Sequence, residues 1–173
     1  MKMKRSFCLF FVFLLVIPLT ACEKSPENIY RLVNALSESF GETHDLSIRY
    51  ADREEEGFVI ADSKALGRLY SGKWETPACM SRISAFAIRL PLDESGFEIH
   101  ALKCVNLSDT DEVAGLLRKR IERLRNAEIK EYAPESYEMY FVGAEIFTCG
   151  DTVFLLATPD NRAAKKFIGR NDY

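Results

Sequence analysis

The stretch I-S-A-F-A-I-R-L-P-L-D-E-S-G-F-E-I-H-A-L-K-C-V, residues 83–105, decides the fold. Residues 83–90 and 97–105 are apolar-rich runs of strand length. Between them, residues 92–96 hold the acidic, serine and glycine residues typical of a turn. Two strands joined by so short a turn must pair antiparallel. The stretch therefore predicts a β-hairpin in the middle of the chain.

A second hairpin is predicted further along the chain. Residues 139–148 and 153–157 are strand-like, and Gly150-Asp151 is a two-residue turn with glycine first, as a type II′ turn prefers. Each hairpin is followed by a helix. The first opens at the capping-box pattern of residues 108–111 and carries an apolar stripe, and the second begins at Thr158-Pro159 and ends near Gly169.

The order ββαββα predicts the α+β class. The simplest arrangement is one four-stranded antiparallel sheet, with an N-terminal helix added and the helices mainly on one face. The N-terminal helix is expected to begin at Ser25-Pro26 and to end at Gly41. Alternation at Leu46, Ile48 and Tyr50 predicts a short edge strand or an extended segment. The charge run 52–56 is expected to be a solvated loop, and a short helix stopped by Gly72 follows it.

The N-terminus has the features of a secretory signal. Three basic residues precede the apolar run 7–19, which is too short for a comfortable membrane span of about 20 residues. The run ends in Leu19-Thr20-Ala21-Cys22, which resembles the bacterial lipobox. This resemblance implies that residues 1–21 are a signal peptide, and that Cys22 receives a diacylglycerol and becomes the acylated N-terminus. The alternatives are an ordinary cleaved signal or an uncleaved anchor.

The lipobox implies that the protein is located on the extracytoplasmic face of the cell membrane and is held there by a diacylglyceryl anchor at Cys22. Residues 22–24 would be a tether of roughly 10 Å, and residues 25–173 a single α+β domain. Removing the three basic residues of the signal takes the net charge from −3 to −6. Because an acidic domain repels nucleic acid, no nucleic-acid partner is expected.

Three cysteines, Cys79, Cys104 and Cys149, remain once Cys8 is removed and Cys22 is lipidated. Their odd number allows at most one disulfide within the chain. They are expected to be small buried core residues. One bridge from Cys104 to Cys149, or a reactive thiol, is the alternative.

The chain is similar to a family of Gram-positive lipoproteins known as domain of unknown function 4358. This resemblance covers nearly the whole mature chain and departs from the family at residues 73–77 and at Cys79. It implies a compact extracytoplasmic α+β domain on a lipid anchor, with no established activity. It is carried by Cys22, residues 29–33, Leu69-Tyr70, residues 97–99, Lys103, residues 120–124, Tyr132, Pro134 and Gly150.

No motif for catalysis stands out. The two histidines, His44 and His100, lie in no nucleophile motif, and His100 and Cys104 are roughly 13 Å apart along the predicted strand. Metal-binding spacings and a glycine-rich phosphate loop are absent from the sequence, so no metal site and no cofactor are predicted.

Six residues are candidates for binding. The basic end of the long helix, with Arg118, Arg120 and Arg123, could bind an anionic envelope ligand or could only complement the helix dipole. Glu98 could contact a ligand or be an edge charge. Tyr70 and Trp74 could line a groove or pack in the core. The lack of a catalytic motif in the sequence favours a non-enzymatic interaction module that binds an envelope ligand or protein. The alternative is a cell-envelope hydrolase that uses acidic residues.

Overall fold

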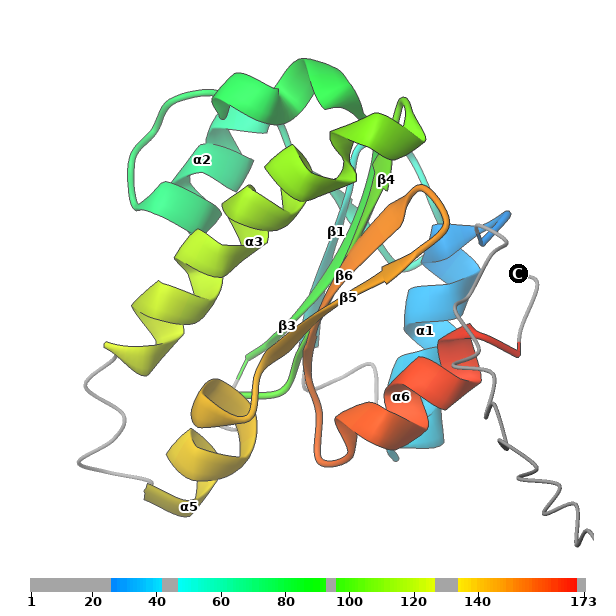
Figure 1. Cartoon of the computed structure of the whole chain (residues 1–173), viewed down its shortest axis with the longest axis vertical. Coiled ribbons are helices and arrows are strands. Elements are labelled where there is room, and N and C mark those ends of the chain that lie inside the picture. The colour runs from blue at the N-terminus through cyan, green and yellow to red at the C-terminus, as the bar shows by residue number, and fades with distance from the viewer. Residues whose placement is uncertain (1–25, 42–46, 93–95, 127–133, 171–173) are drawn as a thin grey trace, which may run out of the picture.

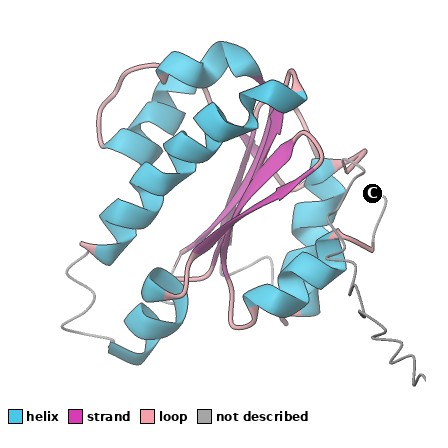
Figure 2. Ribbon diagram, in the orientation of Figure 1, coloured by secondary structure: helices cyan, strands magenta, loops and turns pink. Residues whose placement is uncertain are grey.

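The structure is a computed structural model and describes residues 26–41, 47–92, 96–126 and 134–170. Its centre is a six-stranded sheet with helices on both faces (Figure 1, Figure 2). The α+β class is therefore confirmed. The predicted signal peptide, the lipidation site Cys22 and the tether lie outside the described residues.

The strand order in the sheet is β2-β1-β3-β4-β6-β5. All neighbouring strands are antiparallel except β1 and β2, which are parallel. The strands are β1 (Ser47–Ala51), β2 (Val59–Ile60), β3 (Ile83–Pro91), β4 (Glu98–Cys104), β5 (Glu145–Cys149) and β6 (Thr152–Ala157).

Both predicted hairpins are confirmed. β3 pairs with β4 and β5 pairs with β6, and Gly150 takes a positive φ of 55° in the second turn. The sheet has two more strands than predicted, β1 and β2, next to β3. Because the two-residue β2 forms the edge, β1 is not an edge strand as expected.

Helices cover both faces of the sheet, so the prediction that they lie mainly on one face is wrong. Figure 1 shows α1 (Ile29–Ser39) and α6 (Asn161–Ile168) on one face, and α2 (Ser63–Ser71) and α3 (Thr110–Arg125) on the other. The reason lies in the strands. Every residue of β6 is buried, so its apolar side chains need cover on both sides. Two clusters result, one under α2 and α3 and the other under α1 and α6.

Helix boundaries differ from the predictions where polar side chains compete to cap a helix. Asn28, rather than Ser25, caps α1, and its side chain accepts hydrogen bonds from the backbone of Tyr30 and Arg31. Likewise, Asp160 caps α6 through the N–H of Ala163.

Short helical segments complete the described chain. Residues 139–142 are helical, so the predicted strand 139–148 begins only at Glu145. The segments are η2 (Ala78–Arg82), η3 (Leu107–Asp109), α5 (Pro134–Ser136) and η4 (Tyr137–Val142).

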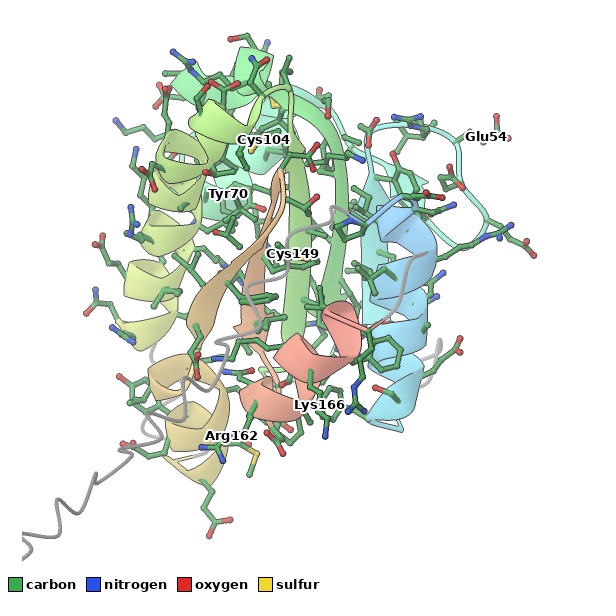
Figure 3. All side chains as sticks on the ribbon, turned by 45° about the vertical axis from the view of Figure 1, so that its right-hand side comes forward. Glu54, Tyr70, Cys104, Cys149, Arg162 and Lys166 are labelled. Carbon is green, nitrogen blue, oxygen red and sulfur yellow. The ribbon has the colours of Figure 1, made fainter. Side chains whose placement is uncertain are left out.

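The cysteines are buried, as predicted, and the alternative of a bridge from Cys104 to Cys149 is wrong. Cys79 and Cys104 are free thiols. Cys149 is disulfide-bonded. Figure 3 labels Cys104 and Cys149 at the sheet.

One residue of the predicted solvated loop after β1, Asp52, makes structural hydrogen bonds. The Asp52 carboxylate accepts hydrogen bonds from the Tyr30 hydroxyl at 2.7 Å and from the Phe86 backbone N–H at 2.8 Å. It therefore joins α1 to β3, whereas residues 53, 54 and 56 are exposed.

Candidate functional site

A buried polar network joins α2, β4 and α3. Tyr70 comes from α2, Glu98 and His100 from one face of β4, and Arg120 from α3. Glu98 and His100 share a face because successive side chains of a strand alternate. Three of the six predicted binding residues, Tyr70, Glu98 and Arg120, thus belong to one hydrogen-bonded group.

The contacts run in a single chain. The Tyr70 hydroxyl lies 2.9 Å from His100 Nδ1, and His100 Nε2 lies 3.0 Å from Glu98 Oε2. Arg120 Nε donates to the same Glu98 oxygen at 3.0 Å, and its Nη2 donates to Glu98 Oε1. Figure 3 shows Tyr70 between the layer of α2 and α3 and the sheet.

The charge of Glu98 follows from these partners. Burial acts to raise the pKa of Glu98, but the hydrogen bonds from His100 and Arg120 outweigh it and lower the pKa to about 2. The side chain is therefore a carboxylate, which can only accept hydrogen bonds.

The proton positions on His100 and Tyr70 follow in turn. Burial lowers the pKa of His100 despite the hydrogen bond to Glu98, so the imidazole is neutral. Its Nε2 must carry the proton, because Glu98 can only accept. Nδ1 is then the acceptor, and the Tyr70 hydroxyl donates to it. Burial also raises the pKa of Tyr70 well above its usual value, which keeps that hydroxyl protonated.

This network has the residue types of a proton relay but is closed to ligands. The residues Tyr70 and His100 are fully buried, Glu98 is 2 % exposed, and the Arg120 side chain is 17 % exposed. Glu98 is also paired with Arg120, so in this arrangement it cannot take a proton from a bound substrate. The network therefore holds α2 and α3 against β4.

The three arginines of α3 do not form one basic surface. Arg120 points to Glu98, whereas Arg123 Nη1 donates to the carbonyl oxygens of Arg68 and Leu69, at 2.8 and 2.7 Å, near the C-terminal end of α2. Arg118 is exposed. The three arginines therefore have different roles. Arg120 joins α3 to β4, Arg123 joins α3 to α2, and Arg118 lies at the surface.

Trp74 and Tyr70, predicted together, separate in the structure. Trp74 is 68 % exposed and lies at an apolar groove of about 220 Å³, whereas Tyr70 is buried and is not among the groove residues. The groove is formed by Tyr50, Ala61, Ala65, Leu66, Arg68, Leu69, Trp74 and Leu90, from β1, β3, α2 and the segments beside α2. We call this the Trp74 groove.

A second cavity, of about 630 Å³, lies between the end of α2, η2 and α3. Its lining includes two carboxylates, Glu75 and Glu112, together with Lys119 and the Cys79 thiol. Glu112 Oε2 is 2.7 Å from Arg82 Nε. Burial raises the pKa of Cys79, so its thiol is protonated and a poor nucleophile.

Sequence reasoning missed His100 as a member of the network. The signal was present in the pattern, because Glu98 and His100 are two polar residues on one face of an otherwise apolar strand. Such a pair in a buried strand must find hydrogen-bond partners. Which helix supplies them depends on the tertiary packing, which the sequence does not show.

The comparisons with known proteins add no relative: no family model matches the chain, and neither a curated protein nor a solved structure matches it. The similarity to domain of unknown function 4358 stays a prediction. Among the described residues, no helix has the length and apolar character to cross a membrane. The same residues contain no group of three or more histidine, cysteine, aspartate or glutamate side chains that could hold a metal ion.

Proposed function

We propose that the chain is a lipoprotein on the extracytoplasmic face of the cell membrane, anchored through Cys22, and that its domain is a non-enzymatic interaction module. The proposed location is based on the lipobox of residues 19–22 and the apolar run before it. The similarity to the lipoproteins of domain of unknown function 4358, which stays a prediction, implies the same location.

The observation that best supports an interaction module is the exposure of Trp74 beside an apolar groove. Tryptophan is among the residues that contribute most to protein–protein binding when it is buried at an interface. Val59, which pairs with Tyr50 across β2 and β1, lies on the same face and is 53 % exposed. The groove is thus bordered by apolar side chains that a partner would cover.

The size of the groove favours a side chain over a free ligand. Its volume of about 220 Å³ is below the range of about 300–1,000 Å³ typical of small-molecule pockets. It is suited to one large apolar side chain. We therefore propose that an envelope protein inserts an aromatic or aliphatic residue beside Trp74.

Photocrosslinking tests this function. A photoreactive phenylalanine analogue replaces Trp74 in the full-length protein, in cells that make it. The matched control carries the analogue at Met139, which is 49 % exposed on the distant segment η4. An adduct with one envelope protein from position 74, absent from position 139, is the expected result. The same adducts from both positions, or none, would contradict the proposal.

A hydrolase is the second candidate, because Glu75 and Glu112 both line the cavity beside Cys79. Paired carboxylates in a cleft are what glycoside hydrolysis needs. In this candidate, Glu75→Gln and Glu112→Gln each abolish the turnover of a cell-wall glycan by the purified protein. Turnover that neither substitution changes would remove the candidate.

A further inference from the structure

The described chain begins at one particular end of the sheet. Lys103 Nζ, near the end of β4, donates to the carbonyl oxygen of Pro26 at 3.1 Å. Pro26 is four positions after Cys22, which at about 3.5 Å per residue is a reach of at most about 14 Å. A lipid on Cys22 would therefore keep this end of the sheet close to the membrane. Figure 1 shows the start of α1 at the same upper end as the end of β4.

Two exposed apolar residues lie at the same end. Val105 and Leu107 directly follow β4 and are 55 % and 66 % exposed. We call these two residues the apolar tip. A single exposed leucine needs no explanation, but two in one turn beside the predicted anchor form a specific arrangement.

The turn that carries the tip is fixed by hydrogen bonds. The backbone N–H of Val105 donates to the carbonyl of Arg82 at 2.8 Å. Asn106 and Asp109 form a reciprocal capping box, and Arg82 Nη1 donates to Asp109 at 2.7 Å. The backbone that carries the two apolar side chains is thus held in place, so little backbone entropy would be lost on binding.

We propose that Val105 and Leu107 insert into the headgroup region of the membrane that carries the lipid of Cys22. This inference rests on the proposed lipid anchor and adds an orientation to it. The partner is the lipid surface itself, which takes up apolar side chains to a depth of about 5–10 Å. Apolar burial must supply the attraction. The first turn of α3 next to the tip is acidic, with Asp111 and Glu112, and does not favour anionic headgroups.

The orientation leaves the Trp74 groove accessible. Four of the groove residues belong to α2, and Figure 1 shows α2 on the face of the sheet opposite α1, to the side of the upper end. A domain resting on its apolar tip would present this groove sideways along the membrane surface. A partner on the same membrane could then reach it.

Quenching by brominated lipids tests the inference. Trp74 is the chain's one tryptophan, so Trp74→Phe gives a background without indole emission. Leu107→Trp in this background puts a probe at the tip, and Val105→Trp is a second tip probe. The matched control is Met139→Trp in the same background, on η4. Each full-length lipidated protein is reconstituted into phosphatidylcholine vesicles whose acyl chains are either plain or brominated near the headgroups.

The expected result is that brominated lipid lowers the emission of both tip probes by about twofold or more, as shallow insertion requires, and leaves the control unchanged. Added salt should not change the quenching. Tip probes quenched no more than the control, in protein whose intact mass shows an acylated Cys22, would overturn the inference and leave the anchor standing. An intact mass without an acyl group at Cys22 would overturn both.

Discussion

His100 lies between a donor and an acceptor. Its Nδ1 is 2.9 Å from the Tyr70 hydroxyl, and its Nε2 is 3.0 Å from Glu98 Oε2. Because the Glu98 carboxylate can only accept, the histidine proton sits on Nε2 and the tyrosine donates to Nδ1. Arg120 closes the other side of Glu98. This relationship makes the network a stabilising element rather than an open site.

Removing Arg120 should destabilise the domain strongly. Arg120→Met leaves Glu98 as a buried carboxylate without its cation, a change that typically costs about 3–5 kcal/mol. Urea unfolding followed by circular dichroism measures the loss. The matched control is Arg118→Met, an exposed position on the same helix, which should stay within about 0.5 kcal/mol of the original protein. Equal effects at the two positions would contradict the assigned role of the network.

The network also predicts how stability depends on pH. The pKa of Glu98 is about 2 in the folded protein, below its unfolded value, so its contribution is present at neutral pH and is lost as pH falls towards 2. The pKa of His100 is also lowered by folding. The unfolded histidine therefore takes up a proton first, and stability begins to fall below about pH 6.5.

Unfolding free energies measured from pH 7 to pH 3 test this direction. In His100→Gln the part of the loss between about pH 6.5 and pH 5 should shrink. A stability that rises on acidification across this range would show that the proton assignment of His100 is wrong.

Gly67 should be needed for the loop that carries Trp74. A Cβ atom at Gly67 would lie 1.7 Å from the backbone oxygen of Glu75, so the loop must move in Gly67→Ala. We expect destabilisation of about 1–3 kcal/mol, as for an overpacked site, and a shifted Trp74 emission maximum. The control is Gly115→Ala in α3, where the added Cβ would meet only Arg118, at 4.0 Å. That variant should be unchanged or up to about 1 kcal/mol more stable. Similar losses in the two variants would contradict the close approach at Gly67.

Filling the Trp74 groove should block binding without unfolding the domain. Ala65 lines the groove and is half-buried. Ala65→Arg places a charge in the apolar groove, and we expect the crosslinking yield from position 74 to fall about tenfold or more, as at an interface hot spot. Lys64→Arg, at the exposed neighbouring position, should leave the yield unchanged. An unchanged yield in Ala65→Arg would place the partner elsewhere.

Local patterns were enough to predict the two hairpins, because glycine and acidic residues separate runs of apolar residues there. Local patterns did not predict that helices cover both faces of the sheet. The run Val153–Ala157 is apolar on both faces, and this continuous pattern should have indicated a sheet covered on two sides. The helical turn of residues 139–142 was missed because aromatic residues there also suit a strand.

For the candidate site, too, local patterns pointed to single residues but not to the role that these residues share. Tyr70, Glu98 and Arg120 were each singled out, but for three separate roles. Their common role depends on contacts between residues 22 and 30 positions apart, which no local pattern encodes. For Trp74 the sequence left a groove and core packing open, and only its 68 % exposure in the structure removes core packing.

The disulfide at Cys149 bears directly on the lipid anchor. Cys79 and Cys104 are free thiols, whereas Cys149 is disulfide-bonded. Cys8 and Cys22 are the chain's other cysteines. A thioether-linked diacylglycerol uses the sulfur of Cys22, so lipidation and a disulfide at Cys22 exclude each other. A disulfide between Cys22 and Cys149 in the protein extracted from membranes would therefore contradict the lipid anchor.

The most direct test of the account is the intact mass of the protein extracted from membranes, with and without reductant, beside that of Cys22→Ala. We predict a chain that begins at Cys22 and carries the mass of a diacylglyceryl group. In Cys22→Ala that lipid mass should be absent. A chain that begins at Met1, carries no lipid and gains two hydrogens on reduction would contradict the lipid anchor and the membrane orientation built on it.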